Sequence, residues 1–254
     1  MTTDPLAGKS ALVTGGARRI GRAIALALAR AGADVAVSYR SSLAEAAQTA
    51  EVITAMGRSS FAVECDVRSE PSVRAAITAV IAKFGRLDVL VNNAAVFGSA
   101  ALESLTLDQW DAVFETNTRG PFLVAREALP HLRTAQGRII NIGSLGGLRA
   151  WPGHAHYCAS KAALHMLTEA MAKAFAPEVS VNCVAPGWID LSDSAATQNQ
   201  ASGDRGEAAR FAAKTPMRRN GAAGDVAQAV LFFATGPSFI TGQVLPVDGG
   251  LGLS

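Results

Sequence analysis

The chain has 254 residues, of which 49% are hydrophobic and 17% are charged, and its formal net charge is +2. This length and composition suffice to bury a complete core, and we expect one domain rather than two small ones. The charge is small and the arginines are scattered, which argues against a surface for nucleic acid or for an acidic membrane. A small anionic ligand is compatible with this balance.

The cysteines and the N-terminal segment indicate a compartment. Cys65, Cys158 and Cys183 are too few and too widely spaced for a disulfide framework or a zinc site, which favours a reducing environment. The segment MTTDPLAGKS lacks the features of a signal peptide, and no apolar stretch approaches the length of a membrane span. His154 and His156 have no carboxylate or cysteine cluster beside them. We therefore expect a cytoplasmic protein with no metal and no membrane contact.

Seven short runs rich in valine and isoleucine are predicted to be strands. They read ALVT near Ala11, DVAVSY from Asp34, SFAVEC from Ser60, LDVLVNN from Leu87, RIINIGS from Arg138, VSVNCVAP from Val179 and QVLPVDGG from Gln243. Such continuous apolar runs are typical of strands buried on both faces of a parallel sheet. The segments between them have helical spacing, as at Ile20, Ile24 and Leu28. The alternation predicts a single-domain α/β fold with a doubly wound parallel sheet, helices on both faces and a ligand crevice at the carboxyl ends of the strands.

The segment from Trp188 to about Thr215 breaks the alternation, because it has little strand pattern and many small polar residues. A long irregular insertion is typical of either an active-site lid or disorder, and its position after a strand favours a substrate lid at about 188–215. Within the single domain, we expect a cofactor half at about 1–137 and a catalytic and substrate half at about 138–254.

A glycine-containing loop, TGGARRIG, follows the first predicted strand and opens the first predicted helix. Backbone N–H groups at a helix N-terminus bind phosphate in this context. Gly15 can make the tight turn, and Gly21 can let the helix approach the sheet. A plain strand-to-helix turn would contain the same glycines, so the loop alone does not decide between the two.

The end of the second predicted strand indicates which dinucleotide the loop would hold. Folds that use NAD place an acidic residue there, whereas this chain has Tyr39, Arg40 and Ser41. A guanidinium and hydroxyls suit a phosphate on the adenosine ribose, and a carboxylate would repel it. Arg18 and Arg19 are expected to converge on the same place, which predicts NADPH rather than NADH. The alternative is that these arginines are solvated surface charges.

Four residues have side chains suited to proton transfer to a carbonyl compound. Tyr157 and Lys161 lie four apart at the start of a predicted helix, where an ammonium would lower the tyrosine pKa from about 10 and make Tyr157 a proton donor and acceptor. Ser144 follows a predicted strand at its carboxyl end, where it could bond a carbonyl oxygen. Asn117 could bond water or backbone nearby. The tyrosine and lysine would also fit an ordinary amphipathic helix surface.

Over essentially its whole length, the sequence resembles the short-chain dehydrogenase/reductase family. The resemblance rests on the glycine loop, Asp66-Val67, Asn92–Ala95, Asn117, Ser144, Tyr157, Lys161, Pro186-Gly187 and Val247–Gly250, in this order. It implies a Rossmann-like sheet of seven strands, a small-molecule substrate and a homotetramer or homodimer.

The resemblance also implies a role for each catalytic residue. Ser144 would orient the carbonyl and Tyr157 would transfer the proton. Lys161 would lower the pKa of Tyr157 and hold the nicotinamide ribose, and Asn117 would anchor a water relay to Lys161.

The residues expected to bind NADP(H) come from the loop, the strand ends and the catalytic helix. They are Gly15, Arg18, Arg19, Ile20, Gly21, Tyr39, Arg40, Ser41, Asp66, Val67, Asn93, Ala94, Ala95, Tyr157, Lys161, Pro186, Gly187 and Ile189. By the resemblance, Asp66 and Val67 would contact adenine, Asn92–Ala95 would lie beside the adenosine ribose, and Pro186–Ile189 beside the nicotinamide.

Arg19 departs from the family pattern, and Ser144 departs from the pattern of one branch of the family. Arg19 stands where the family's T-G-x-x-x-G-x-G loop has its middle glycine, which is similar to the pteridine reductase branch. In that branch Phe97 would stack on a pterin against the nicotinamide, and Arg19 would bond the pterin or the cofactor phosphates. The branch usually has an aspartate where this chain has Ser144, and a serine suits a simple ketone or alcohol. Phe97 could instead be a core or lid aromatic. The expected substrate-binding residues are Phe97, Ser144, Tyr157 and Trp188.

These observations predict an NADPH-dependent oxidoreductase that reduces a ketone, aldehyde or 3-oxoacyl substrate, with Tyr157 as the proton donor. One alternative is a pteridine reductase acting on a dihydropterin or folate. A second is a non-catalytic NADPH-binding sensor, against which the intact catalytic residues argue.

Overall fold

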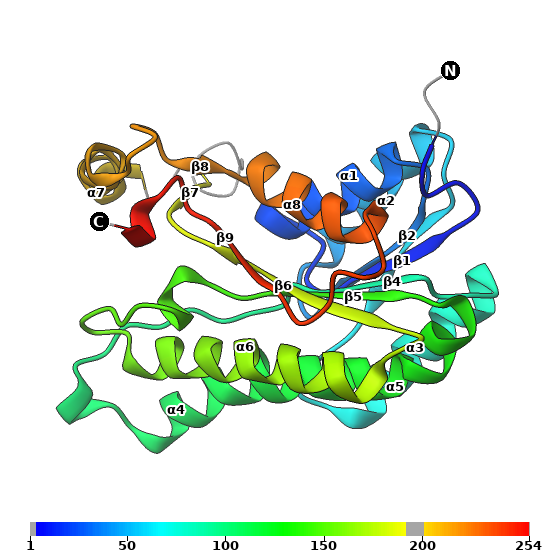
Figure 1. The fold of residues 1–254 in the computed structure, drawn as a ribbon, viewed down its shortest axis with the longest axis horizontal. Helices are drawn as coiled ribbons and strands as arrows, with labels where there is room; N and C mark the ends of the chain where they lie inside the picture. The colour runs from blue at the N-terminus through cyan, green and yellow to red at the C-terminus, as the bar shows by residue number, and fades with distance from the viewer. Residues whose placement is uncertain (1–3, 192–200, 254) are drawn as a thin grey trace.

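Seven parallel strands form the centre of the molecule in the computed structural model, which describes residues 4–191 and 201–253 (Figure 1). They are β1 (Ser10–Val13), β2 (Asp34–Tyr39), β3 (Ser60–Glu64), β4 (Val89–Asn92), β5 (Arg138–Ile142), β6 (Ser180–Pro186) and β9 (Val244–Val247). Their order across the sheet is β3-β2-β1-β4-β5-β6-β9, so the chain winds outward from β1 on one side and from β4 on the other. The seven predicted strands and the doubly wound parallel fold are confirmed.

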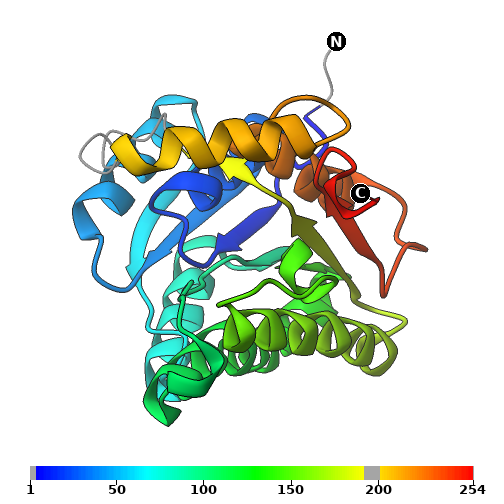
Figure 2. The same ribbon diagram turned by 90° about the vertical axis from the view of Figure 1, so that its left-hand side faces the viewer.

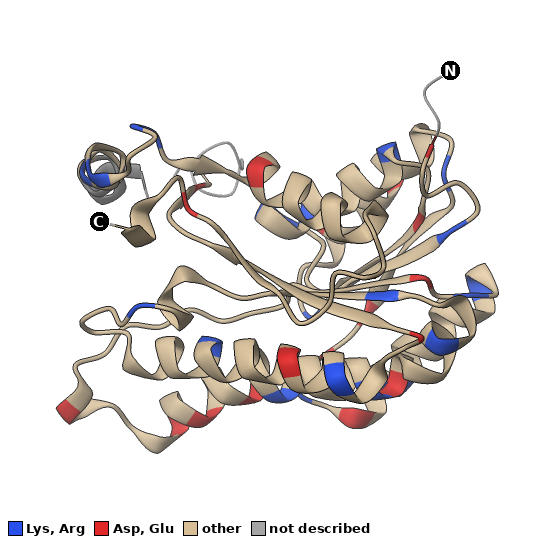
Figure 3. Cartoon of the chain, viewed as in Figure 1, with Lys and Arg blue, Asp and Glu red and all other residues tan. Residues whose placement is uncertain are grey.

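Two layers of helices cover the sheet, as the turned view shows (Figure 2). One face carries α1 (Arg19–Arg30), α2 (Leu43–Ala55) and α8 (Ala223–Thr235), and the other carries α3 (Glu70–Phe84), α5 (Gly120–Ala135) and α6 (Ala155–Phe175). The helix α4 (Leu107–Phe114) continues into α5 through a π-helical turn, Glu115–Arg119. Short 3-10 turns lie at Leu102–Ser104, Leu145–Gly147 and Leu251–Leu253. Along the helical layer of α3 to α6, positions of both charge signs are interspersed (Figure 3).

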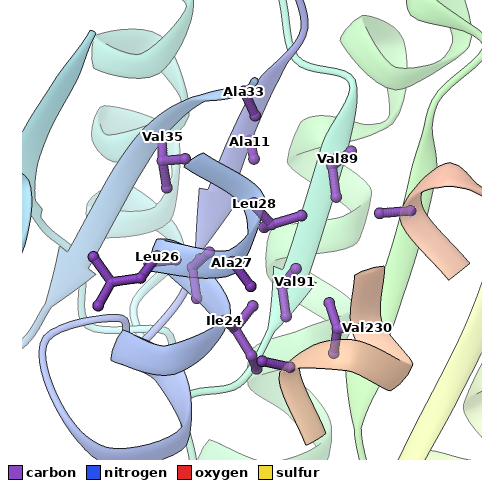
Figure 4. Packing of buried hydrophobic residues seen from close by; sticks show 14 of the residues in the cluster. Ala11, Ile24, Leu26, Ala27, Leu28, Ala33, Val35, Val89, Val91 and Val230 are labelled. Atoms are coloured by element: carbon purple, nitrogen blue, oxygen red, sulfur yellow. The ribbon is translucent and has the colours of Figure 1, made fainter. Parts of the chain in front are cut away.

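Alternate residues of the central strands enter two separate cores. In β1, Ala11 and Val13 face the layer of α1 and α8, while Leu12 faces the layer of α3 and α5. Figure 4 shows the first core, where Ile24 and Leu28 of α1 pack beside the strands. Successive side chains of a strand point to opposite faces, so both cores draw apolar residues from every central strand. This burial explains the continuous apolar runs of the sequence.

The segment from Trp188 to Thr215 contains a helix where the sequence analysis expected irregular chain. Residues 192–200 of this expected lid lie outside the described residues. Ile189–Asp190 form β7, which pairs in parallel with β8 (Gly221–Ala222), and Ala201–Lys214 form α7. The last turns of α7 read AARFAAK, which is rich in strong helix formers. The Phe211 ring stacks on the Trp188 ring, with their centroids 4.2 Å apart.

Candidate active site

A cleft of about 310 Å³ lies at the carboxyl ends of β1 to β4. It is lined by every predicted cofactor residue from the glycine loop to the end of β4: Gly15, Arg18, Arg19, Ile20, Gly21, Tyr39, Arg40, Ser41, Asp66, Val67, Asn93, Ala94 and Ala95. Cys65, Val96 and Thr116 also line it and were not predicted, although each is the sequence neighbour of a predicted residue. The topology explains this agreement, because the carboxyl ends of parallel strands meet at one sheet edge.

The two glycines of the loop have the geometry that the sequence analysis assigned to them. Gly15 has a φ of 61°, a conformation that favours glycine. A Cβ atom at Gly21 would overlap the carbonyl oxygen of Gly15. The side-chain amide of Asn93 donates to the carbonyl oxygens of Thr14 (3.0 Å) and Gly15 (2.9 Å), which fixes the loop against the end of β4. The loop is therefore held tightly, with no side chain between its backbone and the cleft at these positions.

The N-terminus of α1 faces the cleft without a side-chain cap. Its N-cap residue, Arg18, makes no side-chain capping hydrogen bond, and the first turn contains no acidic residue. The first backbone N–H groups of a helix have no partner within it and carry a partial positive charge. Arg18 to Gly21 line the cleft. This arrangement fits the phosphates of a dinucleotide.

Arg19 adopts a left-handed backbone conformation. Its φ is 54°, at the loop position where the family pattern has a glycine. A residue with a Cβ atom pays roughly 1–2 kcal/mol in this conformation. The chain thus places an arginine side chain on the cleft at a cost in backbone strain.

Three arginines at the cleft form no ion pair with any residue that the structure describes. Arg18, Arg19 and Arg40 are exposed and line the cleft. The nearby Asp66 carboxylate is already paired with Arg68, at 2.6 Å between Nη2 and Oδ2. Hydrogen bonds from Arg68, with a smaller contribution from the charge of Arg40, lower the Asp66 pKa to about 2. The charge of Asp66 is therefore neutralised by Arg68 rather than by the three arginines at the cleft.

Asn117 lies in the π-helical turn between α4 and α5 and is fully buried. π-helical turns inside helices occur frequently at functional sites. Its amide nitrogen donates to the carbonyl oxygen of Val96 (2.9 Å) and to Oγ of Ser160 (3.1 Å), and its amide oxygen accepts from the Val96 N–H (2.9 Å). Ser160 Oγ in turn donates to the carbonyl oxygen of Tyr157 (2.8 Å). Asn117 thereby ties the cleft wall to the helix that carries Tyr157, and its water relay stays a prediction.

Ser144 and Tyr157 are brought together by the end of β5 and the first turn of α6. Ser144 follows β5 by two residues, and its Oγ accepts from the Gly146 N–H at 3.0 Å. The Ser144 side chain lies close enough to the Tyr157 phenol to act on its pKa, which it lowers. Two hydroxyl groups thus converge beside the cleft, as a reacting carbonyl oxygen requires.

Lys161 is buried one helical turn after Tyr157. Its Nζ donates to the carbonyl oxygen of Ile142 (2.8 Å) and lies 6.0 Å from the centre of the Tyr157 ring. Burial lowers the Lys161 pKa to about 8. Burial also raises the Tyr157 pKa, and the nearby Ser144 side chain opposes this shift. Desolvation of the phenol therefore outweighs the effects that lower its pKa, and the expected action of Lys161 on Tyr157 stays a prediction.

A cluster of four aromatic rings forms around Tyr157: Phe97, Trp151, His154 and Tyr157 itself. Of these, Phe97 and Tyr157 were predicted as site residues. Phe97 contacts Tyr157 edge-on at 4.8 Å and stacks on His154 at 4.7 Å between ring centroids. Trp151 lies 6.1 Å from Tyr157 and 6.2 Å from His154. Trp151 and His154 lie within six residues of Tyr157, which was the available signal.

The remaining predicted residues lie apart from the cleft lining. Pro186 ends β6, Gly187 follows it, and Ile189 begins β7 in the separate β7-β8 pair. Gly187 donates its N–H to the Val247 carbonyl oxygen. Trp188 packs on Phe211 rather than in the ring cluster around Tyr157. Among the described residues, no three histidine, cysteine or acidic side chains are grouped to hold a metal, and no helix is both long and apolar enough to cross a bilayer.

Comparison with known proteins places this cleft and its tyrosine–lysine helix in one family. A family model described as enoyl-(acyl carrier protein) reductase matches residues 15–252. The chain is 40% identical to the 3-oxoacyl-(acyl-carrier-protein) reductase FabG of Staphylococcus aureus, over 96% of this chain and 98% of the relative. The chain belongs to the short-chain dehydrogenase/reductase family.

Two further comparisons show the range of activities among similar proteins. A hydroxynaphthalene reductase of Aspergillus fumigatus is 37% identical over 91% of this chain and 87% of its own length. A gluconate 5-dehydrogenase of Burkholderia cenocepacia, solved with NADP and tartrate, superposes with a TM-score of 0.90 at 33% identity, covering 99% of this chain and 98% of that one. The family fixes the oxidoreductase class, while the named substrates differ.

Proposed function

We propose that the protein is an NADPH-dependent reductase of carbonyl compounds. The observation that carries the proposal is the approach of Ser144, which follows β5, to Tyr157 on α6. Tyr157 contacts Phe97, the residue after Val96, which lines a cleft suited to a dinucleotide. The FabG relative is named as a 3-oxoacyl reductase, and the Burkholderia structure holds NADP. The first agrees with a carbonyl substrate and the second with a nicotinamide cofactor.

The cofactor would lie along the loop and the strand ends. The uncapped N-terminus of α1 would bind the bridging phosphates, while Arg18, Arg19 and Arg40 would bind the phosphate on the adenosine ribose. Asp66 and Val67 would flank the adenine, and Asn93, Ala94 and Ala95 the ribose. When bound, the nicotinamide supplies a hydride to the carbonyl carbon.

The side chains beside the cleft would act on the carbonyl oxygen. Ser144 and Tyr157 would donate hydrogen bonds as negative charge develops on that oxygen, and Tyr157 would then give up its proton. Lys161 would have to leave the Ile142 carbonyl to reach the nicotinamide ribose or the phenolate. Asn117 would position Tyr157 through Ser160, whose hydroxyl group accepts from Asn117 and donates to the Tyr157 carbonyl oxygen.

A pteridine reductase is the second candidate, since Arg19 lies on the cleft and Phe97 is 64% exposed beside Tyr157. NADPH consumption by the purified protein, measured with a dihydropterin, a 3-oxoacyl thioester and simple ketones and aldehydes, separates the two. Turnover of the carbonyl compounds alone supports the main proposal, and turnover of the dihydropterin supports the second. Tight NADPH binding without any turnover would instead support a non-catalytic sensor.

We also propose that the chain forms a homotetramer or homodimer. Exposed apolar side chains at Phe122 of α5 and Met166 of α6 support an association through these helices. Light scattering after size-exclusion chromatography measures the mass directly, and a monomer would contradict this proposal.

A further inference from the structure

We infer that the substrate pocket beside Tyr157 selects carbonyl compounds that carry a flat, unsaturated ring next to the carbonyl group. The inference rests on the proposed function, because it concerns the substrate class of the same site. It narrows the substrate class of the proposed function and follows from the four rings around the catalytic tyrosine.

The rings of Phe97, His154, Trp151 and Tyr157 contact one another in a closed circuit. Phe97 meets His154 at an interplanar angle of 30°, and Trp151 meets Tyr157 at 20°, so both pairs are stacked. Phe97 meets Tyr157 at 78° and Trp151 meets His154 at 85°, so both of these contacts are edge-on. A carbonyl group bonded to the Tyr157 hydroxyl would thus have aromatic surface on the flanks of that tyrosine.

The loop that carries Phe97 is hydrogen-bonded to the segment that carries Trp151 and His154. The Ala100 N–H donates to the Gly153 carbonyl oxygen (2.9 Å), and His154 Nδ1 is hydrogen-bonded to the Gly98 carbonyl oxygen (2.8 Å). A Cβ atom at Gly98 would overlap the buried ring of His156, so the loop backbone lies directly against that ring. The aromatic wall is therefore held in place before a substrate arrives, which reduces the entropy cost of binding.

Phe97 is the member of this wall that is open to a ligand. It is 64% exposed although it touches both His154 and Tyr157. A large apolar side chain with this exposure in a cofactor-side loop leaves a ring surface for a ligand to cover. A flat ring stacks on such a surface and gains more than apolar contact alone, whereas a saturated ring or chain presents staggered C–H groups and does not. The expected advantage is on the order of three- to tenfold in kcat/KM.

The test compares acetophenone with cyclohexyl methyl ketone, which have the same carbon skeleton and differ in the flatness of the ring. NADPH consumption gives the ratio of the two kcat/KM values for the wild type, for Phe97→Leu and for Phe239→Leu. The difference in intrinsic reactivity between the ketones cancels when this ratio is compared between variants. Phe239 is 99% exposed and belongs to a different loop, so Phe239→Leu is the matched control.

We expect the aromatic preference to fall about three- to tenfold in Phe97→Leu and to stay at the wild-type value in Phe239→Leu. A ratio unchanged in Phe97→Leu, or lowered equally in both variants, overturns the inference while the proposed function stands. If the wild type reduces neither ketone, the inference is tested by binding instead. Calorimetry then compares the dissociation constants of 1-naphthol and 1-decalol for the NADP⁺-loaded protein. Preference for 1-naphthol that is lost in Phe97→Leu supports the inference, and equal binding overturns it. Failure of the proposed function is seen separately, as absence of turnover across the whole carbonyl panel.

Discussion

The ammonium group of Lys161 donates a hydrogen bond to the carbonyl oxygen of Ile142, the last residue of β5. Lys161 is only 2% exposed, and the loss of hydration lowers its pKa to about 8. One carbonyl oxygen does not replace the water around an ammonium group, so the charged form is disfavoured in the folded protein. The lysine therefore lowers the stability of the fold around neutral pH, as expected of a residue placed for chemistry.

Replacing Lys161 with methionine should stabilise the protein and abolish turnover. The folded-state pKa of about 8 lies below the ordinary value of 10.5, so the unfolded chain binds more protons between these values and wild-type stability rises with pH there. The stabilisation by Lys161→Met should therefore reach about 2–3 kcal/mol at pH 7 and largely disappear at pH 10. Urea unfolding at both pH values measures it. Lys173→Met, at an exposed position of α6, is the control, and an equal gain at both pH values would contradict the burial argument.

Removing the Tyr157 hydroxyl should separate catalysis from cofactor binding. In Tyr157→Phe the ring contacts with Phe97 and Trp151 can persist, while the hydroxyl group and its transferable proton are lost. We expect kcat to fall by about 10²–10⁴ or more, with the NADPH dissociation constant within about twofold of wild type. Steady-state kinetics measure kcat, and an NADPH fluorescence titration measures the dissociation constant. Near-normal turnover in this variant would remove Tyr157 from the catalytic role.

His165 should make the fold sensitive to mild acid. Its buried ring accepts the Ser144 N–H at Nε2 (3.4 Å), and Nδ1 has no partner among the described residues. Burial, together with the nearby Lys161 charge, lowers the His165 pKa from 6.5 to about 4. The unfolded chain therefore binds more protons between pH 6.5 and 4, and stability is lost as the pH falls through this window.

The His165→Gln variant tests this window, because it retains an acceptor but cannot titrate. Between pH 7 and 4, wild type should lose up to about 3 kcal/mol more unfolding free energy than the variant. The Asp66 carboxyl titrates below this range, since its pKa is about 2. His131→Gln, at a half-buried position of α5, should keep the wild-type profile. Parallel pH profiles for wild type and His165→Gln would contradict the prediction.

The sheet and the dinucleotide cleft could be predicted because a single physical cause determines both. Strands buried on two faces must be apolar along their whole length, as Ala11 to Val13 are, so the pattern is local in the sequence. Once the parallel order is inferred, the residues after each strand, such as Gly15, Arg40 and Asn93, must meet at one edge.

Features that depend on contacts between distant segments could not be predicted in the same way. The ring cluster joins Phe97 to Trp151 and His154 across more than fifty residues, and no periodicity in the sequence connects them. Whether Lys161 lowers the Tyr157 pKa depends on the partner of Nζ and on the burial of the phenol. The helix α7 was missed because its expected span was treated as one irregular unit, although its last turns have helical composition.

Reversing the charge at Arg40 should change the preference between the two nicotinamide cofactors. Arg40 lies on the cleft without an ion-pair partner among the described residues, and its charge reaches Asp66. In Arg40→Asp a carboxylate would repel the extra phosphate of NADPH, so its dissociation constant should rise at least about tenfold more than that of NADH. Arg40→Gln, which removes the charge without reversing it, should give a smaller change in the same direction. Equal losses for both cofactors would show that Arg40 does not contact the extra phosphate.

The strained backbone at Arg19 gives a prediction that separates the strain from the guanidinium. Arg19→Gly and Arg19→Ala both remove the charge from the cleft, but only glycine adopts a φ of 54° without a Cβ clash. We expect Arg19→Gly to be more stable than Arg19→Ala by about 1 kcal/mol in urea unfolding. Equal stabilities would show that the left-handed conformation costs little at this position.

The same pair of variants decides what the Arg19 side chain binds. If the guanidinium contacts the cofactor phosphates, the NADPH dissociation constant should rise by a similar factor in both variants, by about tenfold for the loss of one charge-assisted contact. If it contacts a substrate instead, NADPH binding should stay near wild type while the KM for a dihydropterin rises. Weaker NADPH binding in both variants fits a carbonyl reductase, because Arg19 and the uncapped end of α1 would then both bind the cofactor phosphates. Unchanged NADPH binding with a higher KM for a dihydropterin would favour a pteridine reductase.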